Sequence, residues 1–424
     1  MEPSIDGPHR GLLIVSAEYG PQSGAEGICT WRLAHALRGA GTEIQVFAPK
    51  SPNAPREPWV EYRRALTQNP IRLQFAAGYL ATGCAMQYWD WALTAARFQT
   101  SATAVYARAL PLASLVAGSR IARSRRIPLI IHFSDPIPSP WDNHKWLRVR
   151  NWYGVLQCLT AQNSYRVIRD LLQQGAGYTF TTKESMLYME RLYQFPFSAR
   201  AAIIRNIVPC FEINPHEKEN TKPEILHAGG CSGKRRAEPL LQGIAAFNSN
   251  ASTRLEFTVL GAAALPNATL TLSQLLNVRI NAPGYISDVV QYYSRAAITA
   301  VIDAEDEEPV FLATKAGEAI QAAQRVLFLT PLRSPARGAF DHGFESIGFS
   351  SHDPGQIAAC IRKLMSVDPA TIQHEMPARR ALLERFRPSA VANDLMSYVA
   401  LCTSALPGGR TSPKSIDALK EHRL

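Results

Sequence analysis

The sequence predicts an α/β protein of two doubly wound domains, each a parallel sheet with helices on both faces. Short apolar runs recur along the chain between longer helical patterns, and the series stops at a polar segment and then restarts. Near-continuous apolar strands that alternate with helices are typical of parallel sheets buried on both faces. A length of 424 residues is sufficient for two such domains.

The apolar runs give the expected strands in order. In the first half they are Leu12–Val15, Ile44–Phe47, Ala104–Tyr106, Leu129–Phe133, Tyr178–Thr181 and Ala202–Ile204. In the second half they are Ile225–Leu226, Phe257–Leu260, Val278–Ile280, Ile298–Ile302, Val326–Leu329 and Ile347–Phe349. Two helical patterns follow, at Pro354–Met365 and Pro377–Leu401.

The domain boundaries follow from a polar, proline-containing stretch between the two series. We expect an N-terminal domain over 1–205, a linker over 206–223 and a C-terminal domain over 224–376. A helix over 377–402 is expected to pack back on the N-terminal domain. The residues 403–424, rich in glycine, proline and polar side chains, are expected to be disordered.

Composition excludes several classes of protein. With 46% hydrophobic and 19% charged residues, the chain is neither disordered nor collagen-like. Its seven cysteines are scattered without a Cys-x-x-Cys pair, which argues against a zinc site or a disulfide framework. The first residues lack a basic secretion-signal region, so a cytoplasmic protein is expected. The uncharged Leu73–Trp89 contains polar residues and predicts a core or interface helix rather than a membrane span.

Ligands of doubly wound sheets bind beyond the carboxyl ends of the strands, so the loops there are the candidate sites. After the first strand, Gly24 and Gly27 precede a helix, which suits either a binding loop or a plain turn. After Leu129–Phe133, His132 and Asp135 are candidates for contacting a sugar hydroxyl or transferring a proton. The alternative is that Asp135 caps a turn and His132 is a core histidine.

Two loops of the second half carry charge. Gly230, Lys234, Arg235 and Arg236 lie before a helix and could cradle a diphosphate, although a solvated basic face would have the same composition. The acidic run Asp303–Glu308 precedes a helix on which two charged residues are i, i+3 neighbours. These are Lys315, which could face a phosphate, and Glu318, which could accept hydrogen bonds from ribose hydroxyls. No metal is expected, because the acidic run lacks a histidine and a tight Asp-x-Asp spacing.

These loops, in this order, resemble those of glycosyltransferases of the GT-B fold, of the group 1 or family 4 type. The resemblance extends from Leu12 to Leu401. It is carried by the glycine loop Pro21–Gly27, by Ile127–Pro136 with its Asp-Pro pair, and by Ala202–Asn206 at the linker.

The resemblance implies a GT-B fold of two Rossmann-like domains facing a cleft. The C-terminal domain would bind a UDP- or GDP-linked sugar and the N-terminal domain a glycan or lipid-linked acceptor, in cell-envelope or exopolysaccharide synthesis. Transfer would retain the anomeric configuration without metal or other cofactor. The implied donor-binding residues are Gly24, Gly27, Gly230, Lys234, Arg235, Arg236, Tyr285, Glu307, Glu308, Lys315 and Glu318.

The chain departs from the family pattern at one position. Val310 stands eight residues before Glu318, where the family has a second glutamate. Glu307 or Glu308 is expected to replace it, and the Lys315 to Glu318 spacing is similar to that of a family variant. Two alternatives therefore stay open: a sugar-nucleotide epimerase of the same fold, and a non-catalytic glycosyltransferase-like scaffold.

The formal charge of +10, from 45 basic and 35 acidic residues, indicates anionic partners. Arg120–Arg126 and His144–Arg150 are basic segments of the N-terminal half that suit an anionic membrane surface, while a solvated helix face is the alternative. We expect peripheral association with the inner face of the membrane. No nucleic-acid partner is expected, because no recognised stacking or groove-binding motif accompanies the cations.

Overall fold

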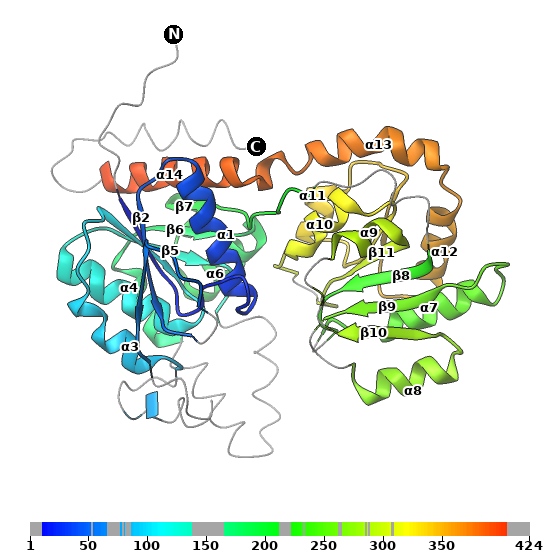
Figure 1. The fold of residues 1–424 in the computed structure, drawn as a ribbon, viewed down its shortest axis with the longest axis horizontal. Coiled ribbons are helices and arrows are strands. Elements are labelled where there is room, and N and C mark those ends of the chain that lie inside the picture. The colour runs from blue at the N-terminus through cyan, green and yellow to red at the C-terminus, as the bar shows by residue number, and fades with distance from the viewer. Residues whose placement is uncertain are drawn as a thin grey trace, which may run out of the picture. The chain divides into compact units, whose positions relative to one another are not determined.

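The structure is a computed structural model, and it describes residues 11–51, 54–65, 77, 78, 80, 86–137, 165–211, 222–231, 234–261, 265–284, 286, 289–306 and 309–404. The chain divides into two compact units. The first comprises Met1–Thr181, Ser185–Arg205 and Pro388–Leu424, and the second comprises Thr182–Glu184 and Asn206–Arg387. The predicted class is confirmed, because each unit is a parallel sheet with helices packed on it (Figure 1).

The sheet of the first unit has the strand order β3-β2-β1-β4-β5-β6-β7, and all neighbours are parallel. Its strands are β1 Leu12–Val15, β2 Ile44–Pro49, β3 Val60–Arg63, β4 Ala104–Arg108, β5 Leu129–Phe133, β6 Gly175–Phe180 and β7 Ala201–Ile203. Its helical elements include α1 Ala25–Gly39, α3 Trp89–Thr94, η1 Ala95–Arg97, α4 Leu112–Arg125, η3 Phe197–Ala199 and α14 Pro388–Ser404. α6 Lys183–Tyr193 begins in the second unit and continues in the first.

The chain order reverses between β1 and β4, which is the switch point of this sheet. The β1 to β2 and β4 to β5 connections run in opposite directions across the sheet. Since such crossovers are right-handed, α1 and α4 cover opposite faces. The strand β3 was missed because it is an edge strand whose burial alternates, so its residues form no continuous apolar run.

The sheet of the second unit has the order β10-β9-β8-β11-β12-β13, with its switch point between β8 and β11. Its strands are β8 Lys222–Ala228, β9 Glu256–Leu260, β10 Ile280–Gly284, β11 Ala296–Ile302, β12 Val326–Leu329 and β13 Ile347–Ser350. Its helical elements include α7 Glu238–Asn248, α8 Asn267–Leu275, α9 Val290–Arg295, α10 Thr314–Ala322, α11 Pro335–Phe340, α12 Pro354–Met365, α13 Pro369–Ala381 and η5 Glu384–Phe386.

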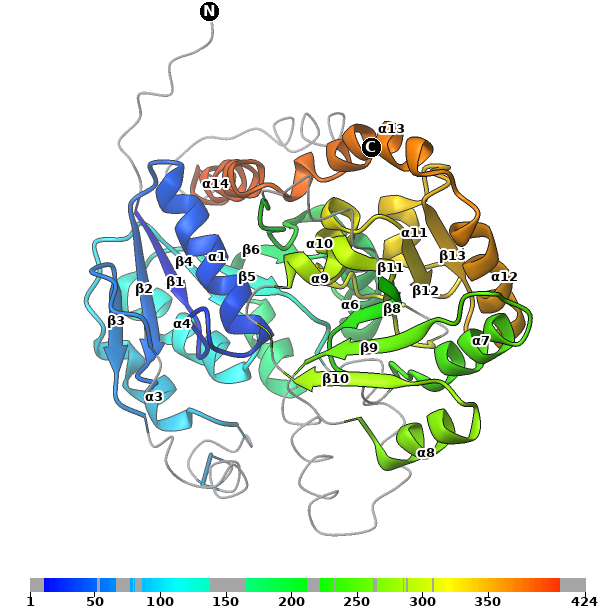
Figure 2. The ribbon, with the colours of Figure 1, turned by 45° about the vertical axis from the view of Figure 1, so that its right-hand side comes forward.

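Both faces of this second sheet are covered (Figure 2). One apolar cluster joins the sheet to α7 and α12 through side chains such as Leu240 and Ile361. The other joins it to α9, α10 and α11 through side chains such as Ile320 and Phe340. Burial on both faces accounts for the continuous apolar runs of the central strands.

The predicted helix over 377–402 is wrong in its bounds. The structure has two helices there, since α13 continues through Pro377 to Ala381 and α14 begins only at Pro388. Between them, Phe386 of η5 is buried, and its carbonyl accepts a hydrogen bond from the Val208 amide at 3.0 Å. A proline is favourable in the first turn of a helix, where its missing N–H costs no bond, so Pro388 marks a helix start.

The last described helix, α14, packs against α1 and β6 in the first unit (Figure 1). The hydroxyl of Tyr398 accepts a hydrogen bond from the Tyr178 amide at 2.9 Å. Gly177 makes this approach possible, because a Cβ there would lie 2.4 Å from the Cys402 sulfur and 2.7 Å from the Tyr398 hydroxyl oxygen. A side chain at position 177 would therefore displace the helix. The residues 405–424 and most of Leu73–Trp89 lie outside the described residues.

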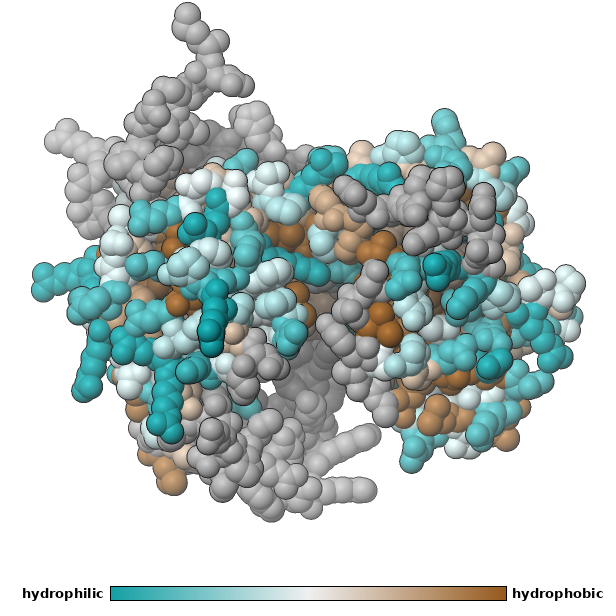
Figure 3. Space-filling view, in the orientation of Figure 1, coloured by the Kyte–Doolittle hydropathy of each residue, from teal (hydrophilic) through white to brown (hydrophobic). Residues whose placement is uncertain are grey.

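Hydrophilic side chains dominate most of the described surface seen in Figure 3. Brown side chains gather near α8, which exposes Leu270 and Leu275. No helix in the described part of the chain is both long and apolar enough to cross a membrane.

One buried cation fixes the end of α10. Arg379 of α13 has no exposed surface, and its guanidinium donates to the carbonyls of Ile320, Ala323 and Gln324 at 2.9–3.0 Å. These are carbonyls at the C-terminal end of α10 and just beyond it, where a helix has no further N–H groups to offer. Burial lowers the pKa of Arg379 to about 10, which still leaves it charged at neutral pH.

We expect Arg379→Met to lower the free energy of unfolding of the second unit by about 3 kcal/mol, because several buried carbonyls would lose their donor. Urea denaturation measures this change. The neighbouring Arg380, which is exposed on the same helix, supplies the control. An equal loss for Arg380→Met would contradict the special role of Arg379.

Candidate functional site

The candidate site of the second unit lies at its switch point, where β8 and β11 are neighbours. The chain leaves β8 into Gly229 and Gly230 and leaves β11 into Asp303. Parallel strands end at the same edge of a sheet, so these two loops lie side by side. A backbone hydrogen bond from Glu305 to the Lys234 carbonyl, 3.3 Å long, joins them further along.

Gly229 is the point at which two ionisable side chains converge. It has a φ of +153°, and its amide donates to the Leu260 carbonyl of the neighbouring strand at 2.7 Å. A Cβ at this position would lie 3.1 Å from Nζ of Lys315 and 3.2 Å from Nε2 of His227. Only glycine therefore lets the ammonium and the imidazole approach the backbone here. A Cβ on Gly230, in contrast, would meet no described atom within 4 Å.

His227 is held as a neutral imidazole with a defined tautomer. It is buried, and its Nδ1 lies 2.9 Å from the carbonyl oxygen of Ala300 on β11. A carbonyl can only accept, so Nδ1 carries the proton. Burial lowers the pKa of His227 to about 4; the nearby charges of Lys315 and Arg235 act in the same direction and the bond to Ala300 opposes them. At neutral pH its Nε2 is thus an acceptor beside Gly229.

Lys315 and Glu318 lie on α10, one turn apart. Lys315 is an exposed residue whose ammonium lies near Gly229, and desolvation of the ammonium is the main cause of its lowered pKa. Arg235 lowers this pKa further, and Glu318 opposes the shift. Glu318 is buried and accepts a hydrogen bond from the Tyr293 hydroxyl at 3.4 Å. The predicted pair therefore lies at the site, with one buried carboxylate and one ammonium.

The three consecutive cations have different surroundings. Lys234 forms an ion pair of 2.9 Å with Asp306, and Arg236 forms an exposed one with Glu305. Arg235 between them acts electrostatically on His227, Lys315 and Asp303. The acidic run thus neutralises two of the predicted phosphate-binding cations, whereas the charge of Arg235 acts on the groups beside Gly229.

Asp303 begins this acidic run and is a structural element of the site. It is buried, and its carboxylate accepts bonds from the Ala304 amide at 2.9 Å and the Thr330 hydroxyl at 3.1 Å. Burial raises its pKa, while these bonds and Arg235 oppose the shift. His352 contacts its backbone carbonyl at 3.1 Å. The predicted site residues Tyr285, Glu307 and Glu308 lie outside the described residues.

The switch point of the first unit contains an ion pair that the sequence reasoning missed. Arg108, at the end of β4, is buried and donates from Nε and Nη2 to the carboxylate of Glu26 on α1 at 2.6–3.1 Å. Ser134, just beyond β5, also donates to Glu26. The available signal was an arginine two residues beyond the predicted strand Ala104–Tyr106, since residues that follow such strands lie at the ligand-binding edge of the sheet.

A second carboxylate lies beside this pair. Glu18, in the loop after β1, is half-buried, and a Cβ on Gly24 would lie 2.7 Å from its Oε2. Burial raises the pKa of Glu18, the charge of Glu26 adds to the rise, and hydrogen bonding from the Gly27 amide opposes it. The glycine loop thus surrounds a carboxylate that the sequence reasoning did not single out.

The structure separates the two residues predicted for proton transfer. His132 is buried within β5, with Nδ1 2.9 Å from the Thr179 hydroxyl, and Nε2 has no hydrogen-bond partner in the described structure. Burial and the charge of Arg108 lower its pKa far below the usual range, so it stays neutral. Asp135 is exposed beyond the strand end. Across the described ranges, no group of three or more His, Cys, Asp and Glu side chains is arranged to hold a metal ion.

The fold is shared with solved glycosyltransferases. HepE of Anabaena, solved with UDP and glucose, is 14% identical with a TM-score of 0.66 over 93% of this chain and 100% of its own. A glycosyltransferase from Rickettsia africae is 13% identical, with a TM-score of 0.63 over 94% and 100%. WaaG, a glycosyltransferase of lipopolysaccharide biosynthesis, is 16% identical, with a TM-score of 0.59 over 94% and 100%.

The chain has the GT-B fold. The expected resemblance is thereby confirmed at the level of the fold. No family model and no curated protein matches the sequence. In this GT-B chain the two switch points hold the groups described above, one in each unit.

The low pKa of His227 predicts a pH dependence of stability. Between its unfolded pKa of about 6.5 and the folded value of about 4, the unfolded chain binds a proton that the folded chain does not. The contribution of His227 is therefore complete above pH 6.5 and is lost as the pH falls toward 4, by about 1 kcal/mol per unit. Urea denaturation between pH 6.5 and 4.5 should show a shallower slope for His227→Gln than for the wild type. His342 is exposed, so His342→Gln should keep the wild-type slope.

Proposed function

We propose that the protein is a glycosyltransferase that moves a sugar from a UDP- or GDP-linked donor to a glycan or lipid-linked acceptor. The observation that carries this proposal is the convergence of Lys315 and His227 on Gly229 at the switch point of the second unit, where the charge of Arg235 acts on both side chains. Cations beside an open glycine backbone suit a diphosphate. HepE, which shares the fold, was solved with UDP-glucose.

The residues then have distinct roles in the proposed reaction. Lys315 and Arg235 stabilise the negative charge that builds on the leaving diphosphate as the glycosidic bond breaks. Gly229 and Gly230 permit close approach of the phosphates, and Glu318 accepts hydrogen bonds from the ribose hydroxyls. The neutral imidazole of His227 offers Nε2 as a hydrogen-bond acceptor for a hydroxyl group of the nucleotide-sugar. We further propose retention of configuration without a metal ion, and assign no protein nucleophile.

The acceptor hydroxyl is proposed to bind at the switch point of the first unit. Glu26 is already neutralised by Arg108, whereas Glu18 has a raised pKa beside the glycine loop. A carboxylate in such surroundings can accept a hydrogen bond from a hydroxyl and take up its proton. Cell-envelope or exopolysaccharide synthesis at the inner face of the membrane remains our proposal for the setting.

The first test is nucleotide binding. We expect one of UDP, GDP, ADP and CMP to raise the melting temperature of the purified protein, because a ligand at 100 times its Kd adds about 2.7 kcal/mol. Arg235→Met and Lys315→Met should each weaken binding about tenfold or more, as charge-assisted bonds contribute about 1.5–3 kcal/mol. Arg236→Met should weaken it less, since Glu305 pairs with Arg236.

Lys363, exposed on α12, gives the control variant Lys363→Met, which should bind like the wild type. If none of the four nucleotides binds, a non-catalytic glycosyltransferase-like scaffold would be favoured over a transferase. Interconversion of a nucleotide-sugar without an acceptor, and without release of nucleotide, would favour an epimerase.

Glu18 provides a separate test of the acceptor side. Using the donor identified above and a panel of alkyl glycosides as acceptors, we expect Glu18→Gln to lower kcat/KM for the acceptor about tenfold, because a charged hydrogen-bond acceptor is lost. The KM for the donor should stay unchanged. Glu61→Gln, an exposed change on β3, is the control. A parallel loss of donor binding would contradict the assignment.

A further inference from the structure

We propose that Glu57 is a positioning residue for the acceptor side of the proposed reaction. It acts through Tyr19, which it holds in place, so that the neighbouring Glu18 carboxylate stays at the switch point of the first unit. This role rests on the proposed function, in which Glu18 takes up the proton of the acceptor hydroxyl. Every residue involved belongs to the first unit.

The carboxylate of Glu57 is held by hydrogen bonds from three aromatic side chains. Its Oε2 accepts from the Tyr19 hydroxyl at 2.5 Å. Its Oε1 accepts from the Trp31 indole at 2.9 Å and from Nε2 of His35 at 2.8 Å. The Glu57 side chain is only 11% exposed, and no lysine or arginine of the described ranges pairs with it. A carboxylate so far out of water depends on such donors, and together they fix its position.

These bonds join three segments of the first unit. Trp31 and His35 are one turn apart on α1. Glu57 lies between β2 and β3, and Tyr19 lies in the loop after β1. The Tyr19 side chain is buried, and its hydroxyl also accepts a hydrogen bond from the Trp59 indole at 3.4 Å. Tyr19 is therefore the residue that attaches the loop after β1 to this cluster.

A second contact follows directly along the loop. Gly20 has a φ of +132°, and a Cβ there would lie 3.0 Å from Cδ of Pro55. Glycine combines this backbone conformation with so close an approach at no steric cost. The segment that carries Glu57 thus packs on the two residues that follow Glu18, which are Tyr19 and Gly20.

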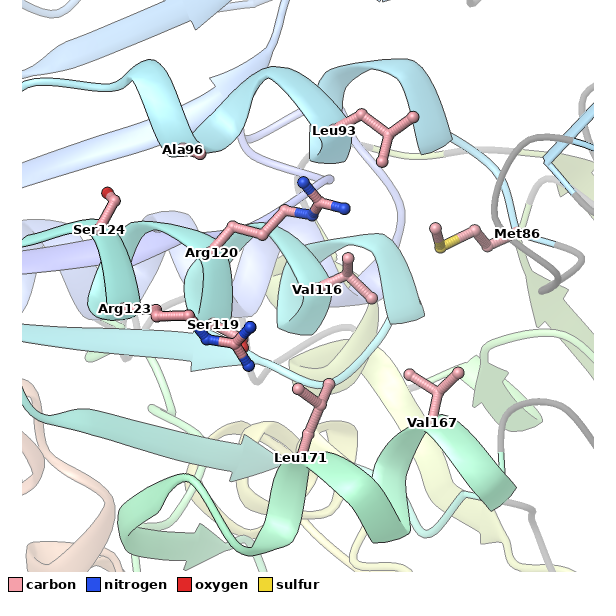
Figure 4. Close-up of a pocket in the computed structure, with 10 residues that line it drawn as sticks. All are labelled: Met86, Leu93, Ala96, Val116, Ser119, Arg120, Arg123, Ser124, Val167 and Leu171. Atoms are coloured by element: carbon pink, nitrogen blue, oxygen red, sulfur yellow. The ribbon is translucent and has the colours of Figure 1, made fainter.

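The residues before Glu18 are held by other groups. The Ser16 hydroxyl donates to the Glu18 carbonyl at 2.6 Å. The Ala17 amide donates to the Ser114 hydroxyl of α4 at 2.7 Å. Ser114 is not among the residues that line the groove of about 440 Å³ on this helix (Figure 4), so α4 holds the loop independently of that groove. Loss of the Tyr19 bond would therefore release only the side of the loop that follows Glu18.

The pKa of Glu18 shows whether its carboxylate keeps its place. Burial raises this pKa, the charge of Glu26 adds to the rise, and the Gly27 amide and Arg108 oppose it. Burial also raises the pKa of Tyr88, which precedes α3, and the Glu18 charge adds to that rise. Since burial is the largest cause for Glu18, a loop that admits water would let its pKa fall toward the ordinary range.

The first test needs no substrate. In the full chain labelled with carbon-13 at the glutamate carboxyls, the NMR signal that Glu18→Gln removes reports the titration of Glu18. We expect Tyr19→Phe, which changes no charge, to lower the pKa of Glu18 by about half a pH unit or more. Tyr62→Phe is the matched control, because the Tyr62 hydroxyl donates at 2.9 Å to the Pro55 carbonyl of the same segment and not to the loop after β1. An unchanged pKa in Tyr19→Phe, or an equal fall in Tyr62→Phe, would overturn the proposal.

Kinetics tests the role in the reaction. Because Glu18 must be ionised to take up a proton, kcat/KM for the acceptor should rise with pH through the pKa of Glu18. With the donor and the alkyl glycosides used above, Tyr19→Phe and Glu57→Gln should lower this kcat/KM about threefold, as one hydrogen bond is lost. Both should also shift its acid limb to lower pH, whereas Tyr62→Phe should keep the wild-type rate and pH profile.

The two experiments separate the positioning role from the proposed function. If the wild type transfers no sugar, the proposed function fails, and the NMR titration still decides whether Tyr19 holds Glu18 in place. If the wild type transfers sugar and Tyr19→Phe keeps the wild-type acid limb, the positioning role alone is overturned.

Discussion

The hydrogen bonds of Arg379 determine how the candidate donor site is held. A helix that ends inside a protein exposes carbonyl groups that water cannot reach, and α10 ends in this way. One guanidinium with several planar donors satisfies carbonyls that a single hydroxyl could not. Because Lys315 and Glu318 are carried by α10, the positions of both depend on an arginine contributed by a later helix, α13. Structural support and ligand chemistry are thus provided by different segments of the second unit.

The ionisable groups at the two switch points are of two kinds: those in ion pairs and those with shifted pKa values. Acidic side chains neutralise Lys234 and Arg236, and Arg108 neutralises Glu26, so these groups mainly join loops to one another. Three groups with shifted pKa values, Glu18, His227 and Lys315, lie beside glycines. Perturbed ionisation at a sheet switch point is typical of functional sites.

The fold was largely predictable from the sequence because central strands buried on both faces leave continuous apolar runs. The edge strand β3 left no such run, and β8 begins earlier than expected because Glu224 is buried through a bond to Thr258 rather than through apolar contact. Residues near the donor site could be nominated from their loops, but their pairing could not. Lys234, Arg235 and Arg236 are adjacent in sequence, and only the fold reveals that two of them face Asp306 and Glu305. The close approach of Gly229 to Lys315 joins segments far apart in sequence, so it could not be predicted from the sequence either.

The return of α14 to the first unit has a consequence for synthesis on the ribosome. The helix that covers α1 and β6 is translated only after the whole of Asn206–Arg387, which forms nearly all of the second unit. At about 5–20 residues per second, the first unit waits on the order of 10–40 s for its last helix. During that interval the surface later covered by Tyr398 and Cys402 is open, and the second unit completes its sequence before the first unit does. In vivo, the unit that begins first is therefore the one that finishes last.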